Sequence, residues 1–321
     1  MPCRIAVFDT NVYYDLSRAA AAELRSSERR AGVVGCASVL VSLEMLARLT
    51  DPTDRRYQLA LKGLAALREH VTIWDYGDRI PFFGTARDAL SVEWFGRPDP
   101  VLRSLSDGLG DLIFRATPNA ATRDPEVREA CARVRAYVDE QEERFGDRLA
   151  DVLARFASIT DEEGKPVVGR KLTKAQYAFH AEHGIRYSAE TLALAICARV
   201  DGQIEPSVLE KHAEHALSVM PVAVGFLRNE LRRFTADGAD PRKPENSNTL
   251  WDLEHCGHAS RSLIPRDARL LGRAAPVLVT NERRIKAAAE ENGAADLVLT
   301  LSEYRQTLNS GFPCGSNDTS S

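Results

Sequence analysis

The sequence lacks any long hydrophobic run. The longest apolar stretches, such as residues 33–41, which include Ser38, reach only about ten residues. A helix that spans a bilayer needs about 20 apolar residues, so we expect no association with a membrane. The first ten residues, MPCRIAVFDT, also lack the basic-then-apolar order of a secretory signal. Both absences predict a cytoplasmic protein.

Paired cysteines and an excess of basic residues are missing as well. None of the six cysteines forms a Cys-x-x-Cys pair, and scattered cysteines are typical of free thiols in a reducing compartment. The 42 Lys and Arg residues face 46 Asp and Glu residues, which gives a formal net charge of −4. This balance argues against a chain coated in basic residues for nonspecific duplex binding, but it does not exclude a locally basic groove.

What is present is a globular composition that changes along the chain. Of the 321 residues, 44% are hydrophobic and 27% are charged, which excludes a mainly disordered chain. Strand-like apolar runs at 4–8, 33–36 and 71–74 alternate with helical patterns near the start of the chain. Runs at 277–280 and 297–299 do the same near its end. Strands that alternate with helices predict an α/β fold with a parallel sheet.

The middle of the chain has a different pattern, with almost no strand candidates. After Asp124-Pro125, apolar residues recur at three- and four-residue spacing as far as Phe156, which predicts one long amphipathic helix. Further helices are expected at 188–200 and 207–234, the second kinked at Pro221. We therefore predict a discontinuous α/β domain at 1–76 and 246–310, a mainly α-helical insertion at 77–245 and a flexible tail at 311–321.

Four acidic residues are expected at the edge where an open parallel sheet binds ligands, beyond the carboxyl ends of its strands. Asp9 and Glu282 follow strand-like runs, and Glu44 and Asp252 lie on helices that begin near the same edge. Clustered carboxylates repel one another unless a cation offsets their charge, and hard divalent ions such as Mg²⁺ take oxygen ligands. Such a site polarises a phosphodiester and activates a water as the nucleophile. Asn11 is suited to orient a carboxylate or a water.

Each of these carboxylates also has a purely structural interpretation. Asp9 is suited to form an Asx-turn after its strand, and Glu44 to pair with Arg48, one turn along its helix. Asp252 occupies the last position of a capping-box pattern, and Glu282 lies in the first turn of a helix, where its charge favours the dipole. No single residue of the four decides between structure and function.

Taken in order, five segments resemble the PIN-domain family of metal-dependent nucleases. They are AVFDTN (6–11), SVLVSLEMLARL (38–49), TLWDLEHCGHA (249–259), PVLVTNERRI (276–285) and DLVLTLSEY (296–304). The resemblance covers roughly 1–75 and 246–310, and it implies a three-layer α/β domain with a central parallel sheet. It also implies that Asp9, Glu44 and Asp252 bind metal. Thr280-Asn281-Glu282 matches the family's Thr-x-Asp element with Glu in place of Asp, which changes where this carboxylate reaches.

The resemblance implies an endoribonuclease that uses Mg²⁺ or Mn²⁺, often as a homodimer. We therefore expect hydrolysis of phosphodiester bonds in RNA by a metal-activated water. The catalytic and metal-binding residues that we predict are Asp9, Glu44, Asp252 and Glu282, with Asn11, Thr280 and Asn281 in support. One alternative is a PIN-like RNA- or protein-binding module with weak or no catalysis, which the Glu282 departure and the overall acidity favour. Another is the toxin of a toxin–antitoxin pair, which implies an inhibitory protein partner.

A second family begins in a similar way. Haloacid-dehalogenase-like phosphohydrolases start with a strand followed by Asp-x-Asp, and Asp9-Thr10-Asn11 resembles that start. Asn11, however, replaces the second aspartate, which is the acid/base of that chemistry, and the later motifs of that family are missing. The PIN-like interpretation accounts for more of the sequence.

Basic residues gather near Glu282, and two histidines lie near Asp252. Residues 261–286 contain seven Lys and Arg and two acidic residues, so their balance is 7 − 2 = +5. We expect the last three of these cations to bind RNA phosphates, with a solvated helix face as the alternative. His255 and His258 are spaced as a zinc pair, but no third and fourth soft ligand has a clear place, so we expect structural or supporting roles. The substrate-binding residues that we predict are Arg283, Arg284 and Lys286.

Overall fold

The computed structural model describes residues 4–71, 80–97, 100–157, 174–200, 205–237, 240–261 and 275–312. Strands and helices alternate at both ends of the described chain. The N-terminal elements are β1 (Arg4–Phe8), α1 (Thr10–Asp15), α2 (Arg18–Ala31), β2 (Val33–Ser38), α3 (Val39–Ala47), a 3-10 turn (Arg48–Thr50) and α4 (Tyr57–Val71). The C-terminal elements are α12 (Asn248–His258), β4 (Ala275–Val279), α14 (Arg283–Glu291), a 3-10 turn (Ala295–Leu297), β5 (Val298–Leu299) and α15 (Leu301–Ser310).

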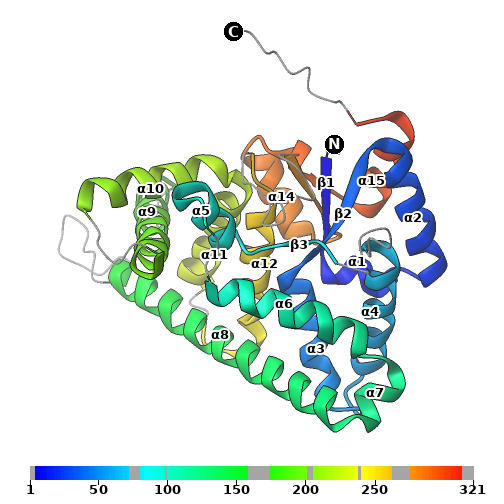
Figure 1. Cartoon of the computed structure of the whole chain (residues 1–321). Coiled ribbons are helices and arrows are strands. Elements are labelled where there is room, and N and C mark those ends of the chain that lie inside the picture. The colour runs from blue at the N-terminus through cyan, green and yellow to red at the C-terminus, as the bar shows by residue number, and fades with distance from the viewer. Residues whose placement is uncertain are drawn as a thin grey trace.

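The strands form one parallel sheet in the order β3-β2-β1-β4-β5, where β3 is the short strand Phe82–Phe83. Helices flank this sheet on both sides (Figure 1). The predicted α/β fold, with three layers and a central parallel sheet, is therefore confirmed. Because β1 and β4 run in register, with Phe8 opposite Val279, the residues that follow both strands leave the sheet side by side.

The central strand is buried on both faces, as its continuous apolar sequence predicts. Ala6 and Phe8 belong to a core formed with α2, α4 and α15. Ile5 and Val7 point to the opposite side, where they pack near Cys36 and other apolar residues. These four of the five β1 side chains are fully buried, so this strand holds both helical layers in place.

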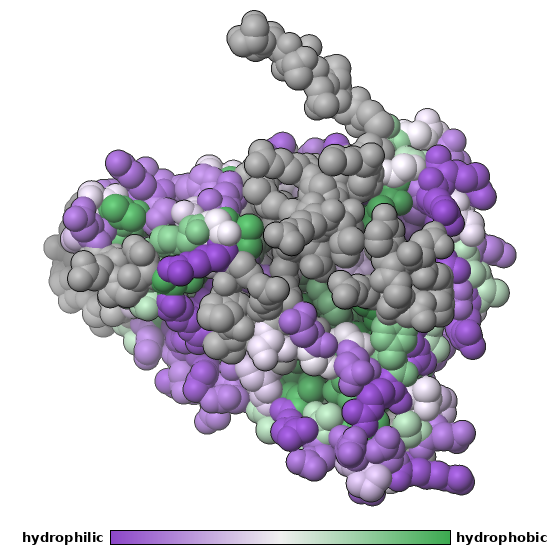
Figure 2. Space-filling model, in the orientation of Figure 1, coloured by the Kyte–Doolittle hydropathy of each residue, from purple (hydrophilic) through white to green (hydrophobic). Residues whose placement is uncertain are grey.

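The middle of the described chain is mainly helical. It contains α5 (Ala86–Phe95), α6 (Pro100–Arg115), α7 (Pro118–Arg123), α8 (Pro125–Ala157), α9 (Lys174–Val200), α10 (Pro206–Val219), α11 (Pro221–Asp237) and a 3-10 turn (Pro244–Asn246). The predicted long helix is confirmed as α8, which runs along the lower edge of the molecule (Figure 1) with hydrophilic side chains on its outer side (Figure 2). The expected kink at Pro221 is a complete break between α10 and α11.

Two details differ from the predictions. The strand predicted at 71–74 is wrong at Val71, which is the last residue of α4, and residues 72–74 lie outside the described chain. The strand that pairs with β2 is instead β3, within the predicted insertion, where Phe82 lies opposite Ala37. The first half of α8 also contributes Val127 and Cys131 to the same core as β1. Described residues within 77–245 therefore complete the sheet and share its core.

The structure also bears on two expectations from composition. Cys36, Cys131, Cys197 and Cys256 are buried thiols that are not joined in disulfides. No helix in the described ranges combines the length and the apolar character that crossing a membrane requires.

Candidate metal centre

Asp9 is held rigidly at the carboxyl end of β1. Its backbone N–H donates to the carbonyl of Val279 at 2.9 Å, and its Oδ2 accepts a hydrogen bond from the Thr280 hydroxyl at 2.7 Å. The residue is only 4% exposed. Asp9 precedes α1, but its side chain makes no capping bond to that helix. The structure therefore supports a role in a site at the sheet edge more than a turn-forming role.

Glu44 reaches the same edge from α3. Ser38 ends β2 and caps α3 by accepting a hydrogen bond from the N–H of Leu40, so the helix begins at the sheet edge, as predicted. The Glu44 carboxylate accepts a hydrogen bond from the hydroxyl of Thr10. The alternative partner, Arg48, instead lies 3.9 Å from Asp54.

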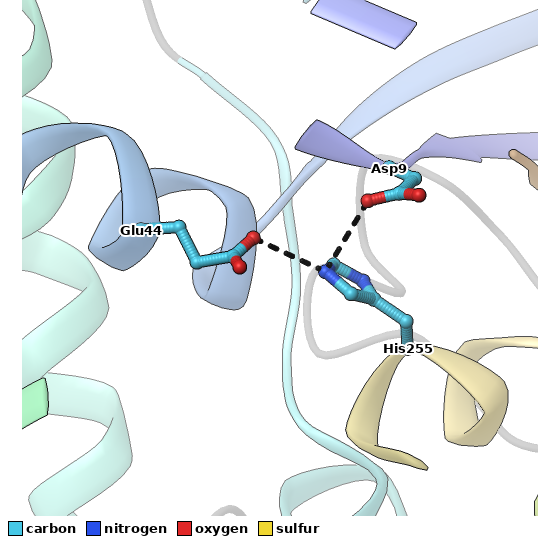
Figure 3. Close-up of side chains that lie close together, drawn as sticks. All are labelled: Asp9, Glu44 and His255. Carbon is cyan, nitrogen blue, oxygen red and sulfur yellow. Dashed lines mark hydrogen bonds and ion pairs between the residues drawn. The ribbon is translucent and has the colours of Figure 1, made fainter. Parts of the chain in front are cut away.

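The third member of this group is His255, on α12. Its Nε2 lies 3.5 Å from Glu44 Oε2 and 3.7 Å from Asp9 Oδ1, and both carboxylates point toward the ring (Figure 3). One ligand atom from each of the three side chains lies within 4.8 Å of the others. Two carboxylates and an imidazole at this separation can hold a metal ion. Asp9, Glu44 and His255 are called the metal group below.

The metal group has strongly perturbed protonation equilibria. Burial raises the pKa of Asp9, because it disfavours the carboxylate form. Burial alone would lower the pKa of His255, but the hydrogen bond to Glu44 and the charges of the neighbouring carboxylates raise it to about 9. At neutral pH His255 is therefore an imidazolium in the metal-free site, where it offsets part of the carboxylate charge, and a metal ion has to replace its proton.

Asp252 and Glu282 lie in the same cleft but are engaged by Arg284. The guanidinium donates to Asp252 and, at 3.4 Å, to Glu282 Oε1. Burial raises the pKa of Asp252 to about 7, although the nearby Arg284 opposes the rise. The N-cap of α12 is Ser247, with no side-chain capping bond, so Asp252 does not act in a capping box. Glu282 is the N-cap of α14, one residue before the first turn in which its structural alternative places it, and its side chain accepts a hydrogen bond from the N–H of Arg284.

The remaining predicted residues fall into different surroundings. Asn11 lines the cleft. The Thr280 hydroxyl accepts a hydrogen bond from the N–H of Glu282 at 3.0 Å, in addition to holding Asp9. Asn281 and Arg283 are exposed and are not among the described residues that line the cleft. Lys286 forms an ion pair with Glu303. Of the three predicted phosphate-binding cations, Arg284 is the one that lines the cleft.

The cleft above the metal group encloses about 300 Å³. The helix α8 supplies part of its wall through Val138 and Glu142, and the Glu142 carboxylate accepts a hydrogen bond from the Trp251 indole at 2.7 Å. Both signs of charge line this cleft, because five carboxylates, those of Asp9, Glu44, Glu142, Asp252 and Glu282, face four arginines. The arginines among its described lining residues are Arg48, Arg56, Arg135 and Arg284.

His255 is the residue of the site that the sequence assigned only a supporting role. It lies three residues after Asp252, and residues at that spacing share one face of a helix. That spacing was the available signal. His258, three residues further, is buried beside Phe83, and burial lowers its pKa to about 3. The two histidines therefore do not act as a pair.

Comparisons of the chain with family models, with curated proteins and with solved structures found no match. The PIN-domain resemblance accordingly stays a prediction from sequence.

Proposed function

We propose that this protein is a divalent-metal-dependent nuclease that hydrolyses phosphodiester bonds in RNA. The observation that carries the proposal is the convergence of Asp9, Glu44 and His255 at the carboxyl edge of a parallel sheet, within a cleft lined by arginines. Enzymes with open parallel sheets bind their ligands at this edge. An anionic metal group suits a cation, and arginines beside it suit the phosphates of a substrate.

The ligand set favours Mn²⁺ over Mg²⁺. Mg²⁺ is bound mostly by oxygen ligands and retains several waters, whereas imidazole suits transition metals and carboxylate suits Mn²⁺. His255 would contribute a nitrogen ligand beside the two carboxylates. Of the two ions implied by the sequence, we therefore propose Mn²⁺ as the one that supports the higher activity.

The residues of the chain have separable roles in this chemistry. When bound, a divalent ion polarises a phosphodiester and activates a water. Thr280 and Thr10 orient the carboxylates of Asp9 and Glu44 through their hydroxyls. Arg56 lines the cleft, where its charge would attract the phosphates that flank the scissile bond.

The decisive experiment measures Mn²⁺-dependent cleavage of single-stranded and structured RNA by wild-type protein and by Asp9→Asn. We expect the substitution to reduce the cleavage rate at least about 100-fold, because it removes one charged ligand from the metal group. Glu129→Gln is the matched control, since Glu129 is an exposed carboxylate on α8 that pairs with Arg133. Equal cleavage by wild type and Asp9→Asn would show that a contaminating nuclease cuts the RNA, and it would refute the proposal.

A second candidate function is an RNA-binding module without catalysis. It is favoured by the engagement of Asp252 and Glu282, two of the four predicted metal-binding acids, with Arg284. Fluorescence anisotropy with a labelled RNA distinguishes the two. A binding module retains RNA affinity in Asp9→Asn and shows no cleavage with Mn²⁺ or Mg²⁺, whereas the nuclease cuts in the wild-type form only.

A further inference from the structure

The guanidinium of Arg284 lies among three carboxylates beside the metal group. It donates to Asp252, to Glu230 Oε1 at 3.1 Å and to Glu282 Oε1 at 3.4 Å. These acids come from three different places in the fold: α12, α11 and the N-cap of α14. Glu230 belongs to the predicted insertion, so residues 77–245 take part directly in this contact.

The position of Arg284 is fixed on several sides. Glu230 is 3% exposed, and its Oε2 is held by Arg233 at 2.6 Å. Arg233 in turn donates to Asn246 at 3.0 Å. The Arg284 guanidinium also lies 5.6 Å from the centroid of the Phe226 ring. At this distance the π face of the ring attracts a cation. These contacts hold the Arg284 side chain in one position within the cleft.

We infer that Arg284 takes the position of a second cation in this cleft, so that the protein binds one divalent metal ion and not two. The inference rests on the proposed metal group, and it concerns the acids outside that group. Asp252, Glu230 and Glu282 carry three negative charges when ionised, which Arg233 and Arg284 reduce to −3 + 2 = −1. Without Arg284 the net charge of the remaining groups is −3 + 1 = −2, which one divalent cation would neutralise.

The side chain of Arg284 competes well with a metal ion from solution. A guanidinium stays protonated at all accessible pH values and makes several hydrogen bonds in a fixed plane. It is also part of the chain, so its local concentration near the three acids does not depend on the metal concentration. Glu282, the first residue before α14, bonds to Arg284 through both the backbone N–H and the side-chain Nε of that arginine.

The test is the stoichiometry of Mn²⁺ on the full chain at pH 8, without RNA, by equilibrium dialysis and electron paramagnetic resonance. We expect one ion per chain and an uncoupled six-line spectrum for wild type. Arg284→Met should bind two ions with a spin-coupled spectrum, whereas Arg284→Lys, which keeps the charge, should bind one. Lys286→Met is the control, because Lys286 lies on the same helix and pairs with Glu303.

Two ions in the wild type, or one in folded Arg284→Met, overturn the inference. Asp252→Asn provides a second measurement that does not depend on the folding of Arg284→Met. It should change the Mn²⁺ affinity by less than about threefold, because Asp252 is bound to Arg284, and a loss of more than tenfold overturns the inference. Wild type that binds one ion but cuts no RNA refutes the nuclease and leaves the inference standing. Wild type that cuts RNA and binds two ions supports the nuclease and overturns the inference.

Discussion

The hydroxyl of Thr280 donates a hydrogen bond to the carboxylate of Asp9 at 2.7 Å, across the edge where two neighbouring strands end. The register of β1 and β4 places the two residues side by side, and the Thr280 N–H donates to the carbonyl of Leu299 at 2.9 Å. Three strands thus fix the orientation of one carboxylate. A fixed carboxylate loses little freedom when it binds a metal ion, so the sheet itself contributes to metal affinity.

Thr280→Val should weaken Mn²⁺ binding by about 10- to 100-fold, which is typical when a group that orients a metal ligand is removed. Valine has the same shape but leaves Asp9 without its side-chain hydrogen bond. Isothermal titration calorimetry measures the change. Thr235→Val is the matched control, because Thr235 is also buried and its hydroxyl donates to the carbonyl of Leu231 in α11. Similar affinities for both variants would contradict the role of Thr280.

His255→Gln should reduce the affinity for Mn²⁺ more than the affinity for Mg²⁺, because it replaces the nitrogen ligand by an amide. The dissociation constant for Mg²⁺ divided by that for Mn²⁺, measured by competition titration, should fall toward one. His258→Gln alters a buried histidine on the same helix that lies outside the metal group, and it should leave the ratio unchanged. A ratio that is the same in wild type and His255→Gln would remove His255 from the ligand set.

The sheet and the positions of its end residues were predictable because they depend on local patterns. The run Ile5–Phe8 is continuously apolar, and it stops at Asp9, so both the strand and the polar residue beyond it are visible in the sequence. The same is true of Thr280 after β4. The strand β3 was not predictable, since two residues show no periodicity.

The contacts within the cleft were less predictable, because they depend on tertiary packing. Arg284 was recognised as a cation near Glu282, but its bond to Glu230 joins residues 54 positions apart. His255 lies on the same helix as Asp252, yet only the packing of α12 against α3 and β4 determines that the imidazole, and not Asp252, faces Glu44. Sequence patterns identify the edge of the sheet, whereas side-chain partners require the fold.

Glu303→Gln should lower the melting temperature at pH 7, because Glu303 closes a capping box with Thr300 at the start of α15. The hydrogen bond from Lys286 and that from the Thr300 N–H lower the pKa of Glu303 from 4.5 to about 2. A depressed folded-state pKa gives stability that is complete above the unfolded-state value and disappears as the pH falls through the folded-state value. The difference between variant and wild type should therefore shrink between pH 5 and pH 2. Glu290→Gln, at an exposed position of α14, is the control in thermal unfolding.

Metal affinity should rise with pH, because the metal-free His255 has a pKa of about 9 and carries a proton at pH 7. A metal ion binds the neutral imidazole, so binding releases that proton, and the dissociation constant should fall about tenfold per pH unit between pH 6.5 and 8.5. Calorimetry in buffers of different ionisation enthalpy counts the released protons, and we expect about one at pH 7.5. In His255→Gln the slope should become clearly shallower, because the group with the pKa of about 9 is gone while Asp9 and Glu44 remain. A pH-independent affinity in the wild type would show that the metal ion binds without displacing the imidazolium proton, and hence outside the group that His255 completes.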